Sequence, residues 1–131
     1  MKSKTDYSII ADFLSSHIKE RIMYELSSPK KIVKAFERLS HNVESVIRSD
    51  YIYYKGNILS DIIKSEISKN VTEFTVLSFE YQQGGRMSAE EAFDYLIYEC
   101  NFAIIASENW LVIKPEYEGG QGLFYVLRKS K

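Results

Sequence analysis

The sharpest candidate for a ligand site in the sequence is the turn Gly84-Gly85-Arg86, between a strand-like and a helix-like segment. A glycine pair, an arginine and a helix start could bind an anion through backbone N–H groups and the helix dipole. The spacing departs from the dinucleotide-binding and P-loop motifs. Glu90 and Glu91 follow in the first helical turn, where they would compete with an anion for the same positive end. An ordinary turn is therefore the favoured interpretation.

Cys100, His17 and His41 are the candidates for nucleophilic or metal chemistry. Cys100 falls on the apolar side of a helix-like segment, where a cysteine is usually a small buried side chain. Neither histidine has a second histidine or a cysteine at metal-ligand spacing, and a zinc site needs three or four protein ligands. The sequence therefore predicts no metal, no cofactor and no catalytic residue, and it favours a protein that is not an enzyme.

A group of basic residues follows Ser28-Pro29, a dipeptide that is typical of a helix start. Basic side chains on one helix face can contact nucleic-acid phosphates, although a solvated face is the commoner explanation. A nucleic-acid-binding transcriptional regulator is therefore the alternative function. Its predicted site consists of Lys30, Lys31, Lys34 and Arg38.

The charges are unevenly distributed along the chain, although the formal net charge is only −1. Residues 1–70 hold 12 Lys and Arg against nine Asp and Glu, a net charge of +3. Residues 71–118 hold two basic residues against nine acidic ones, a net charge of −7. Asymmetry of this kind concerns partners more than the fold. The acidic half would repel a nucleic-acid duplex and attract a basic protein.

Tyrosines are interleaved with these acids, and exposed tyrosines are rigid anchors for protein partners. Tyr95 and Tyr98 lie off the apolar stripe of their helix, which favours exposure, whereas packing in the core is the alternative. We expect a non-enzymatic immunity or antitoxin protein that inhibits a basic partner such as a nuclease toxin, by likeness of class rather than of motif. The predicted partner-binding residues are Glu90, Glu91, Asp94, Tyr95, Tyr98, Glu116, Tyr117 and Glu118.

The element that must position most of these residues is a helix predicted over about residues 88–101. Ser88 and Glu91 have the spacing of a capping box, and the apolar residues that follow recur at helical spacing. The next segments are rich in β-forming residues with polar or Gly-rich breaks, which predicts an antiparallel β-meander. These segments are Phe102–Ala106, Asn109–Lys114 and Gly122–Arg128.

The residues before the meander are predicted to be mainly helical. One helix of about 18 residues starts at a cap on Asp6 or Ser8, a second starts at Ser28-Pro29, and a third covers roughly residues 58–69. Residues 51–54 are either a short strand or a helix end. Residues 72–81 are the longest strand candidate, with either a bulge near Leu77 or both faces covered.

A chain of 131 residues predicts a single domain over residues 1–131. The expected fold class is α+β, with N-terminal helices packed on a small, mainly antiparallel sheet. No run of about 18 apolar residues, which a membrane helix needs, occurs in the sequence. A single cysteine and the lack of a signal-peptide core favour a cytoplasmic protein with no membrane partner.

Overall fold

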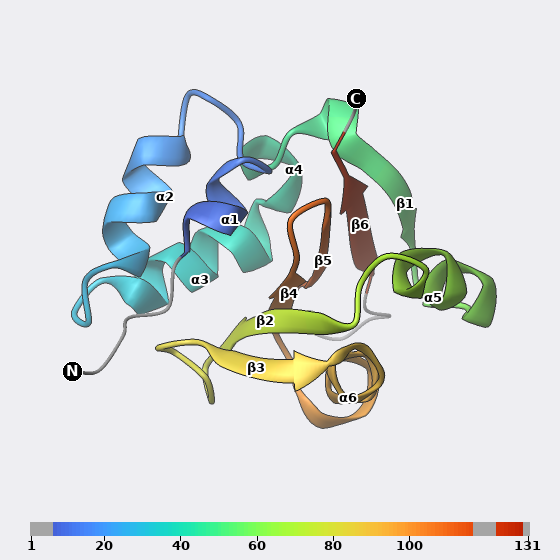
Figure 1. The fold of residues 1–131 in the computed structure, drawn as a ribbon. Helices are drawn as coiled ribbons and strands as arrows, with labels where there is room; N and C mark the ends of the chain where they lie inside the picture. The colour runs from blue at the N-terminus through green and yellow to red at the C-terminus, as the bar shows by residue number, and fades with distance from the viewer. Residues whose placement is uncertain (1–6, 117–122, 130–131) are drawn as a thin grey trace.

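The computed structural model of the chain describes residues 7–116 and 123–129, and a six-stranded antiparallel sheet forms its centre (Figure 1). The strands lie in the order β1-β6-β5-β4-β2-β3. Three of them, β4, β5 and β6, are neighbours in both sequence and space, so the predicted C-terminal meander is confirmed. The strands are β1 (Ile52–Gly56), β2 (Glu73–Ser78), β3 (Gly85–Ser88), β4 (Ala103–Ala106), β5 (Trp110–Lys114) and β6 (Phe124–Arg128).

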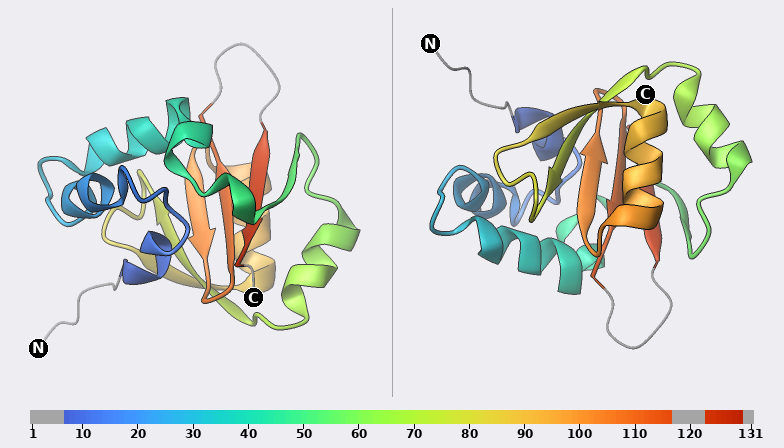
Figure 2. Two further views of the ribbon diagram at one scale, coloured as in Figure 1. Left: turned by 90° about the horizontal axis from the view of Figure 1, so that it is seen from above. Right: turned by 90° about the horizontal axis from the view of Figure 1, so that it is seen from below.

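Helices cover both faces of the sheet, as the two views of Figure 2 show. Helices α1 to α4 pack on one face, and α5 and α6 pack on the other. The last turn of α6 continues as a π-helical segment, η2, before the chain enters β4. The helical elements are α1 (Ser8–Ala11), α2 (Lys19–Leu26), α3 (Ile32–His41), α4 (Val43–Val46), η1 (Ser49–Tyr51), α5 (Asp61–Ser68), α6 (Ala89–Asp94) and η2 (Tyr95–Glu99).

Two hydrophobic cores result, one on each face of the sheet. Because successive strand residues point to opposite faces, the meander strands are apolar almost throughout. The strand residues of the core beneath α1 to α4 are Leu77, Ile104, Ala106, Leu111, Ile113, Tyr125 and Leu127. Those of the core beneath α5 and α6 are Phe74, Val76, Ala103, Ile105, Trp110, Val112, Phe124 and Val126.

The fold class predicted from the sequence is confirmed, and two open questions about strands are answered. The shifted alternation in residues 72–81 reflects burial of both faces, because Leu77 packs in one core and Val76 in the other. The irregularity lies instead in β1, whose register with β6 shifts between Ile52 and Tyr54. Residues 52–54 are therefore strand, preceded by the 3₁₀ turn η1.

The long first helix predicted from the sequence is wrong, because two short helices, α1 and α2, replace it. Residues 12–18 leave the helix to pair with the chain after α4. Leu14 forms an isolated antiparallel bridge with Ile47, and the amide of Ser15 donates to the carbonyl of Val46 at 2.8 Å. These backbone bonds, made at a large sequence separation, outweigh the local helical preference.

Helix α5 confirms the predicted third helix, although it is shorter than expected. The Ser60 hydroxyl caps it by accepting a hydrogen bond from the amide of Ile63 at 3.3 Å. Only part of the predicted apolar face packs on the sheet, since Ile67 is fully buried whereas Ile62 is 82% exposed. Among residues 7–116 and 123–129, no helix has the length and apolar composition needed to cross a bilayer.

Candidate protein-binding surface

The start of α6 has the geometry that the sequence predicts. The Ser88 hydroxyl accepts a hydrogen bond from the amide of Glu91 at 3.2 Å, and the Glu91 carboxylate accepts one from the amide of Ser88 at 3.2 Å. This capping box satisfies two donors of the first helical turn. Ala92 and Phe93 then place the apolar side of the helix in the core, so its opposite side faces solvent.

That outer side carries an acidic surface, which consists of Glu90, Glu91, Asp94, Tyr98 and Glu99. All five residues are exposed, and Tyr98 is 78% exposed. Glu90 and Asp94 are four residues apart in α6, which aligns them on one helix face, and Tyr98 lies in η2, which continues the helix. Within the described part of the chain, no lysine or arginine forms an ion pair with any of the four carboxylates. Their negative charge is therefore open to a partner.

Tyr95 is the clearest correction to the predicted site. Its side chain is 4% exposed, and its hydroxyl lies 2.8 Å from the Ser78 hydroxyl and donates to the Glu80 carboxylate at 3.2 Å. Its ring packs edge-on against Tyr81 at a centroid distance of 5.4 Å. Burial raises the pKa of Tyr95 to about 12. The expected exposure is wrong because the end of β2 and the following turn supply polar partners for a buried phenol.

The remaining acidic candidates are not gathered on α6. Glu116 lies at the end of the described segment after β5, where its amide donates to the Ser40 hydroxyl of α3 at 2.6 Å. Helix α3 packs on the opposite face of the sheet from α6, so Glu116 is separate from the acidic surface. Tyr117 and Glu118 lie outside the described residues.

Three of the four basic candidates are exposed to solvent, whereas the fourth forms an ion pair within the protein. Lys30, Lys31 and Lys34 are exposed. Arg38 instead forms a bidentate ion pair with Glu25 of α2, with Nε–Oε1 and Nη2–Oε2 distances of 2.9 and 3.0 Å. Glu25 is only 3% exposed, so its carboxylate depends on this guanidinium for its counter-charge. Arg38, predicted as part of the nucleic-acid site, therefore connects α2 to α3 through this ion pair.

Replacing Arg38 should test this structural role. We expect Arg38→Gln to lower the thermal midpoint by several degrees, because it leaves a buried carboxylate without a counter-charge. Lys34→Gln, an exposed charge loss on the same helix, serves as the control and should leave the midpoint unchanged. Differential scanning calorimetry of the two variants measures the difference. Equal midpoints would contradict the structural role of Arg38.

The glycine-arginine turn is part of a β-hairpin. Gly84 has a φ of 89°, which glycine adopts readily, while Gly85 and Arg86 already belong to β3. The Arg86 guanidinium pairs with the Glu73 carboxylate on the neighbouring strand. A side chain at Gly85 would meet the Tyr81 ring, 2.9 Å from the added carbon atom. The hairpin thus accounts for all three residues of the motif.

The cysteine and the two histidines are not arranged as a reactive centre. Cys100 is partly buried, and burial raises the pKa of its thiol to about 11, so the thiol stays protonated near neutral pH. His17 lies in the turn before α2 and His41 is the last residue of α3, and both are exposed. The described residues contain no group of three or more His, Cys, Asp or Glu side chains that could hold a metal ion.

No protein-family model, curated protein or solved structure matches this chain. The exposed surface of α6 and η2 is therefore the feature from which a function can be inferred. Of the predicted partner-binding residues, the structure brings together Glu90, Glu91, Asp94 and Tyr98. The predicted site omitted Glu99, which joins them at the end of η2. Its position one residue after Tyr98 in the same helical run is the signal that could have found it.

Proposed function

We propose that this protein is a non-enzymatic binding module that inhibits a basic protein partner through the acidic surface of α6 and η2. The observation that carries the proposal is the set of unpaired, exposed carboxylates around Tyr98. An immunity or antitoxin protein acting in the cytoplasm on a nuclease-type toxin fits this chemistry, because a nuclease must present cationic groups to its phosphate substrate.

The carboxylates of this surface would steer a basic partner, and Tyr98 would anchor it. Neighbouring carboxylates along this helical run lie within a Debye length of about 10 Å of each other, so an approaching basic partner meets their summed field. Complementary charge mainly raises the association rate. Tyr98 adds a rigid aromatic side chain that can bury its area at a low entropic cost. The capping box and the packed side of α6 hold this surface in place before binding.

Charge reversal on α6 and η2, in what is called the α6 variant, tests the proposal. The triple variant Glu90→Lys, Asp94→Lys and Glu99→Lys should weaken partner binding by roughly 10- to 100-fold, because attraction becomes repulsion. Glu91 is left intact because it closes the capping box. The partner is first captured from a nuclease-treated host extract with the tagged protein, and its affinity is then measured by calorimetry at several salt concentrations. Wild-type affinity should fall as salt increases, and the variant should lose this dependence.

A matched control changes the same number of charges elsewhere. The variant Lys30→Glu, Lys31→Glu and Lys34→Glu should keep the wild-type affinity for the captured protein. Circular dichroism confirms that both variants fold. An α6 variant that binds the partner as tightly as the wild type does would refute the acidic surface as the binding site.

The alternative function, nucleic-acid binding, is supported by the exposure of Lys30, Lys31 and Lys34. It is weakened by the engagement of Arg38 with Glu25. The same two variants separate the functions. In a second capture from an extract without nuclease treatment, nucleic acid recovered with the wild-type protein and with the α6 variant, but lost with the lysine variant, would favour this alternative.

A further inference from the structure

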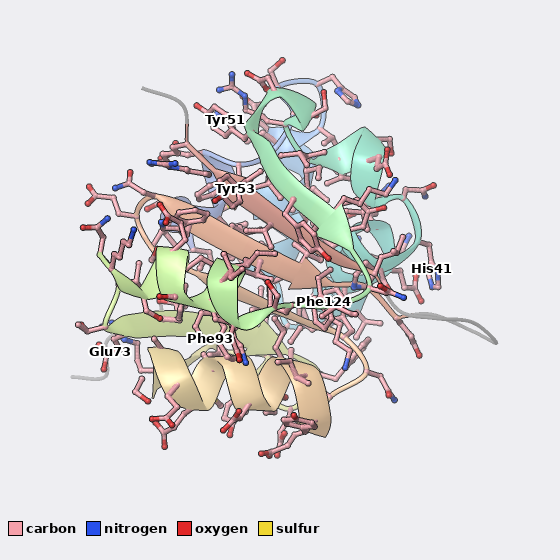
Figure 3. The ribbon with its side chains drawn as sticks, turned by 90° about the vertical axis from the view of Figure 1, so that its right-hand side faces the viewer. His41, Tyr51, Tyr53, Glu73, Phe93 and Phe124 are labelled. Atoms are coloured by element: carbon pink, nitrogen blue, oxygen red, sulfur yellow. The ribbon has the colours of Figure 1, made fainter. Side chains whose placement is uncertain are left out.

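A hollow of about 710 Å³ opens at the end of the sheet where β2 begins, β4 turns into β5 and β6 ends. Neither the acidic surface nor the hairpin motif uses it as a site. Figure 3 labels two residues of this region, Glu73 on the wall of the hollow and Tyr53, whose ring contacts that of Trp110. The volume lies within the range of small-molecule sites, about 300–1,000 Å³.

The basic residues of the C-terminal half gather at this hollow. Residues 71–129 contain four lysines and arginines, and three of them, Arg86, Arg128 and Lys129, line it. The fourth, Lys114, donates to the carbonyl of Cys100 at 2.7 Å. The fold thus sorts the cations of an otherwise acidic half to one end of the sheet, from positions more than forty residues apart in sequence.

Two of these three cations already have carboxylate partners. Arg86 pairs with Glu73, and Lys129 pairs with Asp12 at 2.8 Å. Arg128 differs, because no carboxylate among the described residues forms an ion pair with it. Its positive charge is therefore available to an anionic ligand.

The Arg128 guanidinium is also held in place. Arg128 lies opposite Trp110 in the β5–β6 register, and its guanidinium carbon is 5.4 Å from the centroid of the Trp110 ring. Trp110 is only 3% exposed and packs edge-on against Tyr53 at 5.1 Å. A buried ring thus supports the cation, which lowers the cost of ordering it around a ligand.

The walls favour hydroxyl groups rather than a flat ring. Apart from Val71 and Trp110, the neutral side chains at the hollow are amides and hydroxyls, which can donate to and accept from ligand hydroxyls. The one tryptophan is too buried to stack against a ligand base. These neutral polar residues are Asn70, Thr72, Ser107 and Asn109, and the Glu108 carboxylate, which also lines the hollow, can accept hydrogen bonds from ligand hydroxyls. We propose that the hollow binds a phosphorylated polyol, such as a sugar phosphate, with the phosphate on Arg128 and the hydroxyls on these side chains.

Trp110 is the only tryptophan of the chain, so its fluorescence reports on this site alone. The experiment titrates the full chain with ribose 5-phosphate at constant ionic strength. We expect a saturable change in fluorescence. Its midpoint should shift at least about tenfold toward higher concentration in Arg128→Gln, because this variant loses a charged hydrogen bond to the ligand. Ribose and inorganic phosphate alone should each bind more weakly than the intact ester. Lys34→Gln, remote from the hollow, should match the wild type.

Three outcomes would overturn the proposal: no saturable response, an unchanged midpoint in Arg128→Gln, or equal binding of inorganic phosphate and ribose 5-phosphate. Asn70→Ala is a second variant that does not alter the support of Trp110. This variant should weaken the binding of ribose 5-phosphate and leave the binding of inorganic phosphate unchanged. A short 5′-phosphorylated oligonucleotide is tested in parallel, and tighter binding of it would overturn the small-molecule assignment. None of these measurements depends on the acidic surface of α6.

Discussion

Replacing Phe36 by alanine should lower the free energy of unfolding by about 3–5 kcal/mol. Phe36 is fully buried on α3, and its ring lies 5.1 Å from that of Phe79 and 5.2 Å from that of Phe102. The three rings join α3 to the end of β2 and to the start of β4. Alanine at this position leaves a cavity beneath α3 and removes both ring contacts.

The loss would be a large part of the total stability, since a domain is typically stable by about 5–15 kcal/mol. Urea unfolding followed by circular dichroism measures it, with the slope of the transition as a check on two-state behaviour. Phe36→Leu, which retains much of the volume, should cost clearly less. An alanine variant within about 1 kcal/mol of the wild type would show that the site collapses around the cavity or that α3 packs more loosely than described.

Replacing Phe74 by alanine should have an effect of similar size, about 3–5 kcal/mol, but in the other core. Phe74 of β2 is 1% exposed, and its ring lies 5.7 Å from that of Phe93 on α6. This contact is one of those that fasten the helix carrying the acidic surface to the sheet. The loss of Phe74 should therefore loosen α6 as well as lower global stability.

Amide hydrogen exchange separates these two effects. In Phe74→Ala, the amides of α6 should lose more protection than those of α3, whereas Phe36→Ala should show the reverse. Urea unfolding gives the global loss for each variant. Equal loss of protection in α3 and α6 for both variants would contradict the division into two cores on opposite faces of the sheet.

The elements that could be predicted from the sequence are those stabilised by near neighbours in the chain. The capping box of α6 joins residues three positions apart, and the amphipathic repeat after Ser88 sets its buried side. The turn residues between β4 and β5 likewise lie within a short segment. Local interactions of this kind are present in the sequence pattern itself, so the helix and the meander could be predicted.

The errors arose where contacts distant in sequence outweighed local preference. The helix predicted over about residues 8–26 is interrupted because Leu14 pairs with Ile47 in a β-bridge, and the neighbouring backbone groups form hydrogen bonds across this bridge instead of within a helix. Tyr95 can be buried because its hydroxyl forms hydrogen bonds with Ser78 and Glu80. Arg38 is engaged because α2 presents a buried Glu25 to it. No spacing along the chain reveals such partners.

The sequence by itself determined the α+β class, the helix that bears the acidic residues and the excess negative charge of residues 71–118. Periodicity, capping and charge are properties of short segments, so they can be recognised without knowledge of the fold. Only the tertiary structure decided which of these charges remain unpaired. It left Glu90, Asp94 and Glu99 without ion pairs on α6 and η2, paired Arg38 with Glu25, and placed Arg128 over Trp110 at the end of the sheet. The physical reason is that counter-charge and burial depend on groups brought together from distant parts of the chain.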